Sequence, residues 1–326
     1  MNVSLSVIVP VYGVEKYIER CAVSLFEQSL EDIEFIFVND QTKDDSIRIL
    51  ETVINRYVHL KYRIKIINHQ QNMGQAAARS TGLGFATGEY VIYLDSDDWV
   101  DQKLYEKMYF QAKKENADIV CCNFKFVYKT SIKELKFEEE QRSFLNLNEL
   151  NFDLLYSSLC NKIVRREIYV KNNLSFFKGV NMWEDVGMMT RLRYYCKKVN
   201  FLHENLYYYY NKQNETSIVS IPKEANIIQQ IQCANMLEIF FMNKEDDYSL
   251  VTSFLKFMAK SDYLYNDKIR NIKKWQNINQ DSNESVFKYS KLPLNMRFLA
   301  WLASKNNILL LSFLLFIKKK LVGVNK

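Results

Sequence analysis

The sequence has little glycine, little proline and only short apolar runs. Of its 326 residues, 8 are glycine and 3 are proline, which excludes collagen-like and proline-rich disordered chains. Hydrophobic residues make up 48% of the chain, enough for one large core or two smaller ones. The apolar run at 308–317 includes a serine and is too short to span a bilayer, so it is expected either to lie in a membrane interface or to pack as a core helix.

Motifs for structural metals and for secretion are also missing. The six cysteines show no Cys-x-x-Cys spacing and the three histidines are scattered, so structural zinc is not expected. The N-terminus leads directly into a strand-like segment, residues 4–11, without the basic and apolar regions of a secretory signal. We therefore expect a reducing, cytoplasmic location with free thiols.

Acidic residues are absent from the last segment of the chain. Residues 291–326 contain seven Lys or Arg and no Asp or Glu, whereas the first 290 residues carry 37 basic and 38 acidic groups. The net charge of +6 therefore belongs to the tail. This distribution argues against nucleic acid as a partner and predicts that the tail meets an anionic surface, most simply the inner face of a membrane.

Strand and helix patterns alternate through the first part of the chain. Strands are expected at 5–9, 35–38, 64–67, 90–94 and 119–124, with helices at 14–26, 47–57, 75–85 and 102–115. This alternation predicts an α/β fold with a mainly parallel sheet and flanking helices. Residues 125–150 are poorly periodic and favour a loop over one sheet edge, and the pattern after Pro222 is helical, at 224–241 and 248–265.

Three polar clusters follow predicted strands, at 10–12, 39–41 and 95–98. Ligands of parallel sheets bind at the carboxyl ends of the strands, so these clusters are expected to share one site. Residues 95–98 place three carboxylates within four positions, and their repulsion would be relieved by Mg²⁺ or Mn²⁺. The same residues could form only a turn and a helix cap, and the motif alone does not decide between the two interpretations.

Taken together, several motifs resemble the family 2 glycosyltransferases with the GT-A fold. They are SVIVPVY at 6–12, VEKYI at 14–18, VND at 38–40, NMG at 72–74, AR at 78–79, Gly82 and GEYVIYLDSDD at 88–98. A weaker match, at 161–162, 183–185, 210–212 and Ser217, is similar to the acceptor half of bacterial members that build surface polysaccharides. The resemblance implies a glycosyltransferase domain at 1–220, with a nucleotide-sugar half at 1–124 and an acceptor half at 125–220, followed by a helical region at 221–326.

The resemblance also assigns roles to individual residues on the donor side. Pro10, Val11, Tyr12 and Asp40 would hold the base and ribose, with Tyr12 flanking uracil and Asp40 accepting its imide hydrogen. Residues 39 and 41, Asn and Gln, depart from the family's usual residues, which could alter base recognition while leaving the Asp40 carboxylate in place.

The diphosphate and metal would be held by the second group of residues. Asp95 and Asp97 match the Asp-x-Asp pair that contacts the ribose and the metal, and Asp98 is a further candidate ligand. Gly74, Arg79 and Ser96 would line the nucleotide, with Arg79 a candidate phosphate contact.

On the acceptor side, Asp185, which follows Glu184, matches the general base. Both acidic residues would also suit the first turn of a helix, because they oppose its dipole. Lys212 lies where many relatives carry Arg, so a phosphate contact there is weakened.

The implied function is inverting, metal-dependent transfer of a hexose or N-acetylhexosamine. The donor would be a nucleotide sugar, most simply a UDP-sugar, and the acceptor a glycan, most simply lipid-linked, in surface polysaccharide synthesis. The enzyme would sit on the cytoplasmic face of the membrane. Two alternatives remain open, an inactive membrane-associated scaffold that binds nucleotide sugar, and a sugar-phosphate nucleotidyltransferase. The latter is disfavoured because PVYGVE, and no Gly- and Arg-rich loop, follows the first strand.

Overall fold

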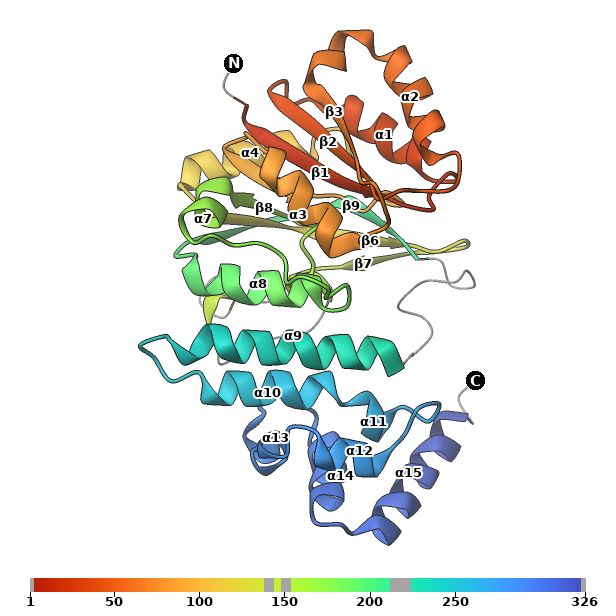
Figure 1. Ribbon diagram of the computed structural model, residues 1–326, viewed down its shortest axis with the longest axis vertical. Coiled ribbons are helices and arrows are strands. Elements are labelled where there is room, and N and C mark those ends of the chain that lie inside the picture. The colour runs from red at the N-terminus through yellow and green to blue at the C-terminus, as the bar shows by residue number, and fades with distance from the viewer. Residues whose placement is uncertain (1–2, 138–143, 148–153, 212–223, 324–326) are drawn as a thin grey trace. The chain divides into compact units, whose positions relative to one another are not determined.

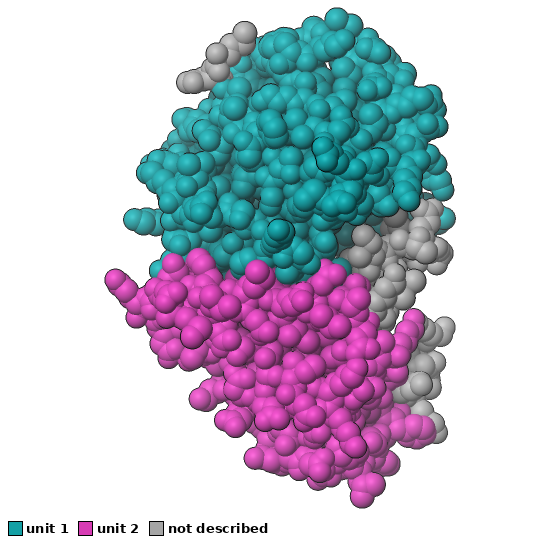
Figure 2. All heavy atoms as spheres, viewed as in Figure 1, with its two compact units in different colours: residues 1–147, 151–217 teal, residues 148–150, 218–326 magenta. Residues whose placement is uncertain are grey.

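Figure 1 shows the computed structural model, which describes residues 3–137, 144–147, 154–211 and 224–323. The chain forms two compact units (Figure 2). One unit contains Met1–Leu147 and Asn151–Ser217, and the other contains Asn148–Leu150 and Ile218–Lys326.

Nine strands, counted over the described residues, form one sheet in the first unit. Their order is β3-β2-β1-β4-β8-β6-β9-β5, and β7 pairs with β6 outside this path. Their bounds are β1 Leu5–Val11, β2 Ile33–Asn39, β3 Ile64–Asn68, β4 Tyr90–Tyr93, β5 Trp99–Val100, β6 Ile119–Val127, β7 Ile132–Leu135, β8 Lys162–Arg165 and β9 Val199–Tyr210.

The first four of these strands in chain order are parallel to one another. In β1, Val7 lies opposite Phe35 of β2 on one side and Ile92 of β4 on the other. These strands are almost wholly apolar because helices cover both faces. The carboxyl ends of β1, β2 and β4 therefore lie at the same edge of the sheet.

The expected parallel pairing is found among β1 to β4 and again between β6 and β9, and β8 makes the sheet as a whole mixed. β8 lies between β4 and β6 and is antiparallel to both. β7 forms an antiparallel hairpin with β6, where a loop was expected, and the two-residue strand β5 pairs with β9. Such short strands depend on distant partners for their pairing, which a local pattern cannot show.

Helices cover the sheet of the first unit on both faces. They are α1 Ile18–Phe26, α2 Ser46–Arg56, η1 Val58–Arg63, α3 Gln75–Phe85, α4 Leu104–Glu115, α6 Leu154–Ser157, α7 Arg166–Lys171 and α8 Glu184–Tyr195. Right-handed crossovers put α1 and α2 on one face and α3 on the other, as Figure 1 shows. Helix α3 packs tightly on β1, because a Cβ atom at Gly82 would lie 2.3 Å from Cγ2 of Ile8.

The second unit is helical, as predicted. It consists of α9 Glu224–Met242, α10 Ser249–Ala259, α11 Asp262–Tyr265, α12 Ile272–Asn277, α13 Asp281–Glu284, η3 Val286–Lys288, α14 Leu294–Ser304 and α15 Ile308–Gly323. Its buried side chains include Leu237, Phe257, Trp275 and Leu302. Within the described ranges, every helix is either too short or too polar to cross a bilayer.

Candidate active site at the carboxyl edge of the sheet

The loop after β1 contributes the first predicted residues to the site. Tyr12 is about half exposed, whereas Val11 is completely buried and its carbonyl accepts the backbone N–H of Asp40 at 3.1 Å. Val11 therefore faces the core and holds the end of β2, while Tyr12 presents its ring at the surface. Pro10 lies beside them as a partly buried member of β1.

Asp40, directly after β2, organises the turn that precedes α3. Its side chain is 4% exposed. Oδ1 accepts the backbone N–H of Met73 at 2.8 Å and lies 2.7 Å from Nδ1 of His69, and Oδ2 accepts the N–H of Gly74 at 2.7 Å. A carboxylate only accepts, so Nδ1 of His69 carries the proton, and its Nε2 lies 2.9 Å from the Thr81 hydroxyl. Asp40 is thus satisfied by the protein itself.

Gly74 joins this turn to the segment before α8. Its φ of +87° is in the left-handed region, and a Cβ atom there would lie 2.3 Å from the Asn181 amide. Asn181 Oδ1 accepts the backbone N–H of Ala76 in the first turn of α3 at 3.1 Å. Any other residue at position 74 would be strained and would displace Asn181.

The acidic loop after β4 directs the carboxylates of Asp95 and Asp98 to different partners. Asp95 Oδ1 accepts Arg79 Nη2 at 2.7 Å and Gln75 Nε2 at 3.0 Å. Asp97 is partly exposed, and its backbone carbonyl accepts Arg20 Nη2 at 2.9 Å. Ser96 between them is buried.

Asp98 turns inward, and its carboxylate bonds to β9. Its Oδ2 accepts the Tyr207 hydroxyl at 2.5 Å and its Oδ1 accepts the backbone N–H of Tyr210 at 2.8 Å. Burial, followed by the charges of Asp97 and Asp95, raises the pKa of Asp98 well above its usual range. These bonds anchor the loop to β9, and the lone pairs left on the two oxygens keep Asp98 a candidate metal ligand.

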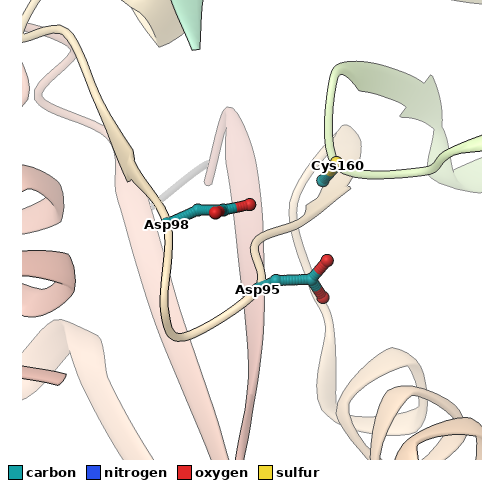
Figure 3. A group of neighbouring side chains, drawn as sticks. All are labelled: Asp95, Asp98 and Cys160. Carbon is teal, nitrogen blue, oxygen red and sulfur yellow. The ribbon is translucent and has the colours of Figure 1, made fainter. Parts of the chain in front are cut away.

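Cys160 also lies beside the acidic loop, as Figure 3 shows. Ligand atoms of Asp95, Asp98 and Cys160 all lie within 4.8 Å of one another. Burial, with the nearby Asp95 and Asp98, raises the pKa of the Cys160 thiol well above its ordinary value, so it stays protonated and suits a hard cation poorly. The predicted donors for Mg²⁺ or Mn²⁺ are therefore the carboxylates of this loop, Asp95, Asp97 and Asp98.

Arg79 connects the acidic loop to α8. This buried guanidinium, 4% exposed, donates through Nη2 to Asp95 and through Nη1 to Glu184 Oε1 at 2.9 Å. Burial opposes its charge, but Asp95, Glu184 and Asp185 outweigh that effect and raise its pKa above the ordinary value. The structure thus brings together the predicted residues of the two halves.

Glu184 and Asp185 occupy the first turn of α8 in different surroundings. Among the described residues, Glu184 forms an ion pair with Arg79, whereas Asp185 forms none and accepts only the N–H of Val186 at 2.7 Å. Burial raises the pKa of both carboxyls, and Asp185 adds to the rise at Glu184. A helix cap and a proton acceptor are compatible here, since the N–H groups of the first turn stabilise a carboxylate.

Arg20 is a supporting residue that sequence reasoning missed. Its guanidinium lies 3.6 Å above the Trp99 ring, and Trp99 stacks on Tyr208 of β9 at 5.2 Å. Arg20 also lines a surface cavity of about 490 Å³ along α1, with Lys16 and Glu19. None of the predicted site residues lines that cavity, so it is not the site described above. His69 and Cys160 were missed as well, because neither has a spacing signal. Lys212 and Ser217 lie outside the described residues.

This fold and site define a GT-A protein, with an acid-rich loop at the carboxyl edge of the sheet and an acidic helix start beside it. The family model described as "Glycosyl transferase family 2" matches residues 6–171. The chain therefore belongs to glycosyl transferase family 2. Glu184 and Asp185 lie beyond the matched range.

Individual relatives agree with this assignment. The chain is 32% identical over 249 residues to "Uncharacterized glycosyltransferase EpsJ" of Bacillus subtilis (strain 168), covering 73% of this chain and 70% of the relative. It is 32% identical over 231 residues to "Cholesterol galactosyltransferase" of Borreliella burgdorferi, covering 66% of this chain and 62% of the relative. The S. aureus TarS 1-349 structure in complex with UDP-GlcNAc has a TM-score of 0.71 at 20% identity, covering 94% of this chain and 88% of that one.

Proposed function

We propose that this protein is an inverting, metal-dependent glycosyltransferase that moves a hexose or N-acetylhexosamine from a UDP-sugar to a hydroxyl of a glycan acceptor. The observation that carries the proposal is the Arg79 bridge, with 2.7 Å to Asp95 and 2.9 Å to Glu184. It joins the acidic loop of the donor half to the residue beside the proposed base. A UDP-sugar is favoured because TarS, which shares the fold, is in complex with UDP-GlcNAc.

The base and ribose would bind at the ends of β1 and β2. Tyr12 offers an exposed ring for stacking on uracil, and Pro10 and Val11 fix its backbone. Asp40 Oδ2 accepts one bond, from Gly74, and a carboxylate oxygen has room for two. The imide hydrogen of uracil would share this oxygen with Gly74.

Mn²⁺ or Mg²⁺ would be held by Asp97 and Asp95, and when bound it offsets the charge that develops on the leaving diphosphate. Asp98 holds the loop against β9 through Tyr207 and Tyr210. Arg79 orients Asp95 and adds a fixed positive charge next to the diphosphate. Ser96, buried between the two ligands, fixes their spacing.

Asp185 is the proposed general base. In an inverting transfer the acceptor hydroxyl attacks the anomeric carbon opposite the leaving diphosphate, and a carboxylate takes the hydroxyl proton. The burial that raises the pKa of Asp185 brings that carboxyl closer to the working pH and makes it a stronger base. Glu184 is bonded to Arg79 and is therefore a positioning residue.

The acceptor is proposed to be a lipid-linked glycan of a surface polysaccharide, used at the cytoplasmic face of the membrane. Two facts support this. The last segment is basic and acid-free, and one relative, "Cholesterol galactosyltransferase", is named for a lipid acceptor.

A thermal-shift panel tests the donor site. UDP, GDP, CDP and TDP are added with and without Mn²⁺ to the wild type and to Asp97→Asn. Stabilisation by UDP that needs Mn²⁺ and disappears in Asp97→Asn is the expected result. The absence of a shift with any nucleotide and metal would overturn the donor assignment.

Donor turnover separates an enzyme from a scaffold. The wild type is incubated with UDP-sugars and Mn²⁺, and UDP release is measured with and without glycan acceptors. We expect slow hydrolysis of one UDP-sugar and faster release with an acceptor. Nucleotide binding without turnover of any donor would favour the scaffold.

A further inference from the structure

The second unit exposes an unusual density of large apolar side chains between η3 and α15. Nine of the twenty large hydrophobic side chains exposed in the described part of the chain lie between positions 287 and 317. They are Phe287, Leu294, Phe298, Trp301, Leu309, Leu310, Phe313, Phe316 and Ile317, here called the apolar face. Scattered exposed leucines are normal, but a concentration of this kind marks an interaction surface.

Helix α15 has apolar residues on its inner and outer sides. Leu311 and Leu315 are buried, whereas Leu309, Phe313 and Phe316, on the other side, are 88%, 59% and 55% exposed. A helix on a water-facing surface would carry polar residues at these outer positions. The only polar residue between positions 308 and 317 is Ser312.

Helix α14 and η3 extend this arrangement. Leu294, Phe298 and Trp301 recur at helical spacing on the exposed side of α14. Trp301 stacks on Phe298 at 5.7 Å and lies 6.4 Å from Phe287 of η3. Arg297 fixes the preceding turn, because its Nε and Nη2 donate to the carbonyls of Leu292 and Ser290 at 2.5 Å. The exposed aromatic rings are thus held in place by the fold.

The sequence that carries most of the apolar face, from position 285 onward, has charge of one sign. From position 285 to 326 the sequence contains eight Lys or Arg and no Asp or Glu. Lys288 and Lys305 are exposed beside the aromatic residues, and residues 318–320 continue α15 as three lysines. Two copies of this face brought together would oppose like charges, whereas an anionic lipid surface would complement them.

We infer that the apolar face is a docking surface for an anionic membrane, with the aromatic and leucine side chains of α14 and α15 entering the headgroup region. Aromatic and aliphatic residues beside lysines are the combination that interfacial helices use. Docking on a membrane would bring the enzyme close to the proposed lipid-linked acceptor. Only this link to the acceptor rests on the proposed function. Binding to vesicles can be measured without any transfer reaction.

Vesicle sedimentation of the full chain tests the surface. The probes are vesicles of equal parts phosphatidylglycerol and phosphatidylcholine, and vesicles of phosphatidylcholine alone. We expect binding to the anionic vesicles and much weaker binding to the neutral ones. Raising the salt to about 1 M, where the Debye length falls to about 3 Å, should weaken the binding.

A matched pair of variants assigns the binding to the apolar face. The double variant Phe313→Ser, Phe316→Ser should lower the partition of the protein onto anionic vesicles by about tenfold or more. It lacks two aromatic rings that would be buried in the lipid. Phe110→Ser on α4 is the control, because Phe110 and Phe313 are 58% and 59% exposed. Equal binding by the double variant, the control and the wild type would overturn the inference.

A second measurement does not depend on the double variant folding. Brominated lipids in anionic vesicles should quench tryptophan fluorescence of the wild type, and should quench Trp301→Phe less. Light scattering without lipid tests whether the apolar face instead binds a second copy of the chain. A wild-type dimer that the double variant converts to monomer would make the face a contact between copies and overturn the membrane assignment. UDP binding should be unchanged in every variant, so loss of vesicle binding alone leaves the proposed function standing.

Discussion

Two groups of carboxylates at the same sheet edge are neutralised in different ways. Asp40, after β2, receives two backbone N–H groups and the His69 imidazole. The second group comprises Asp95, Asp97, Asp98, Glu184 and Asp185, and Arg79 forms ion pairs with two of its members, Asp95 and Glu184.

The difference separates a carboxylate held by hydrogen bonds from a group of crowded, buried or partly buried carboxylates. Asp40 holds a turn in its final shape through hydrogen bonds that do not depend on any bound ion. In the second group, burial and mutual repulsion raise the pKa values of Asp98, Glu184 and Asp185. A divalent cation bound there would relieve the repulsion between the charged forms.

The largest effect is expected from removing the cation that is present. Arg79→Met would leave Asp95 and Glu184 buried without their partner, and should lower the free energy of unfolding by about 3–5 kcal/mol. Urea denaturation measures it. Arg165→Met is the control, because Arg165 lies 3.4 Å from Asp118 and 3.8 Å from Glu89 and is more exposed than Arg79. Equal losses in the two variants would contradict the special role of Arg79.

Asp185→Asn should affect activity rather than stability. Loss of the general base should lower kcat by about 10²–10⁴-fold. Its pKa is raised by burial, so the neutral amide should leave the melting temperature unchanged or higher. Steady-state kinetics with the donor and acceptor, beside a thermal melt, give both numbers. If Glu184→Gln lowered kcat by this factor and Asp185→Asn left it unchanged, Glu184 would be the general base and Asp185 the positioning residue.

Asp40→Asn should lower the stability of the fold by the same amount with and without metal. The amide has one acceptor oxygen in place of two and would turn its NH₂ toward an N–H donor. We expect a loss of about 1–3 kcal/mol in unfolding free energy. Thermal melts with and without Mn²⁺ should give the same difference from the wild type. If the difference in melting temperature between the variant and the wild type disappeared with Mn²⁺, Asp40 would belong with the proposed metal ligands.

The smallest effect concerns pH. The pKa of Asp98 is raised by burial and by Asp97 and Asp95, so its charged form destabilises the fold as pH rises above the unfolded value of about 3.9. Asp97→Asn removes part of the repulsion. Without metal this variant should therefore be more stable than the wild type by about 1 kcal/mol at pH 7 and equally stable near pH 4. Mn²⁺ should reverse the order at pH 7, because only the wild type retains both proposed ligands.

The sequence predicted the parallel half of the sheet and most of the candidate site. Apolar runs of four to nine residues bounded by polar turns are local signals, and β1 to β4 follow them. The orientation of Asp98 was beyond local reasoning, since it depends on hydrogen bonds to Tyr207 and Tyr210 in β9. Three neighbouring aspartates have the same chemistry, and only their tertiary partners distinguish them.

The supporting residues were missed for the same reason. His69 acts on a carboxylate 29 positions earlier and Arg20 on a carbonyl 77 positions later. Neither pairing produces a periodic pattern or a short motif. The two-residue strand β5 was missed because it exists only through its pairing with β9.

The reversed direction of β8 has a consequence for how this protein can diversify. Because β8 runs against β4, with Val91 opposite Val164, its beginning lies at the edge where the parallel strands end. The residues before β8 therefore lie next to the residues after β4. This is why Cys160 lies beside Asp95. The buried Lys162 holds this approach by donating to the carbonyls of Leu155 and Ser158 at 2.7 Å. Exchanges in the residues that lead directly into β8 therefore change this side of the site while β1 to β4 keep their sequence.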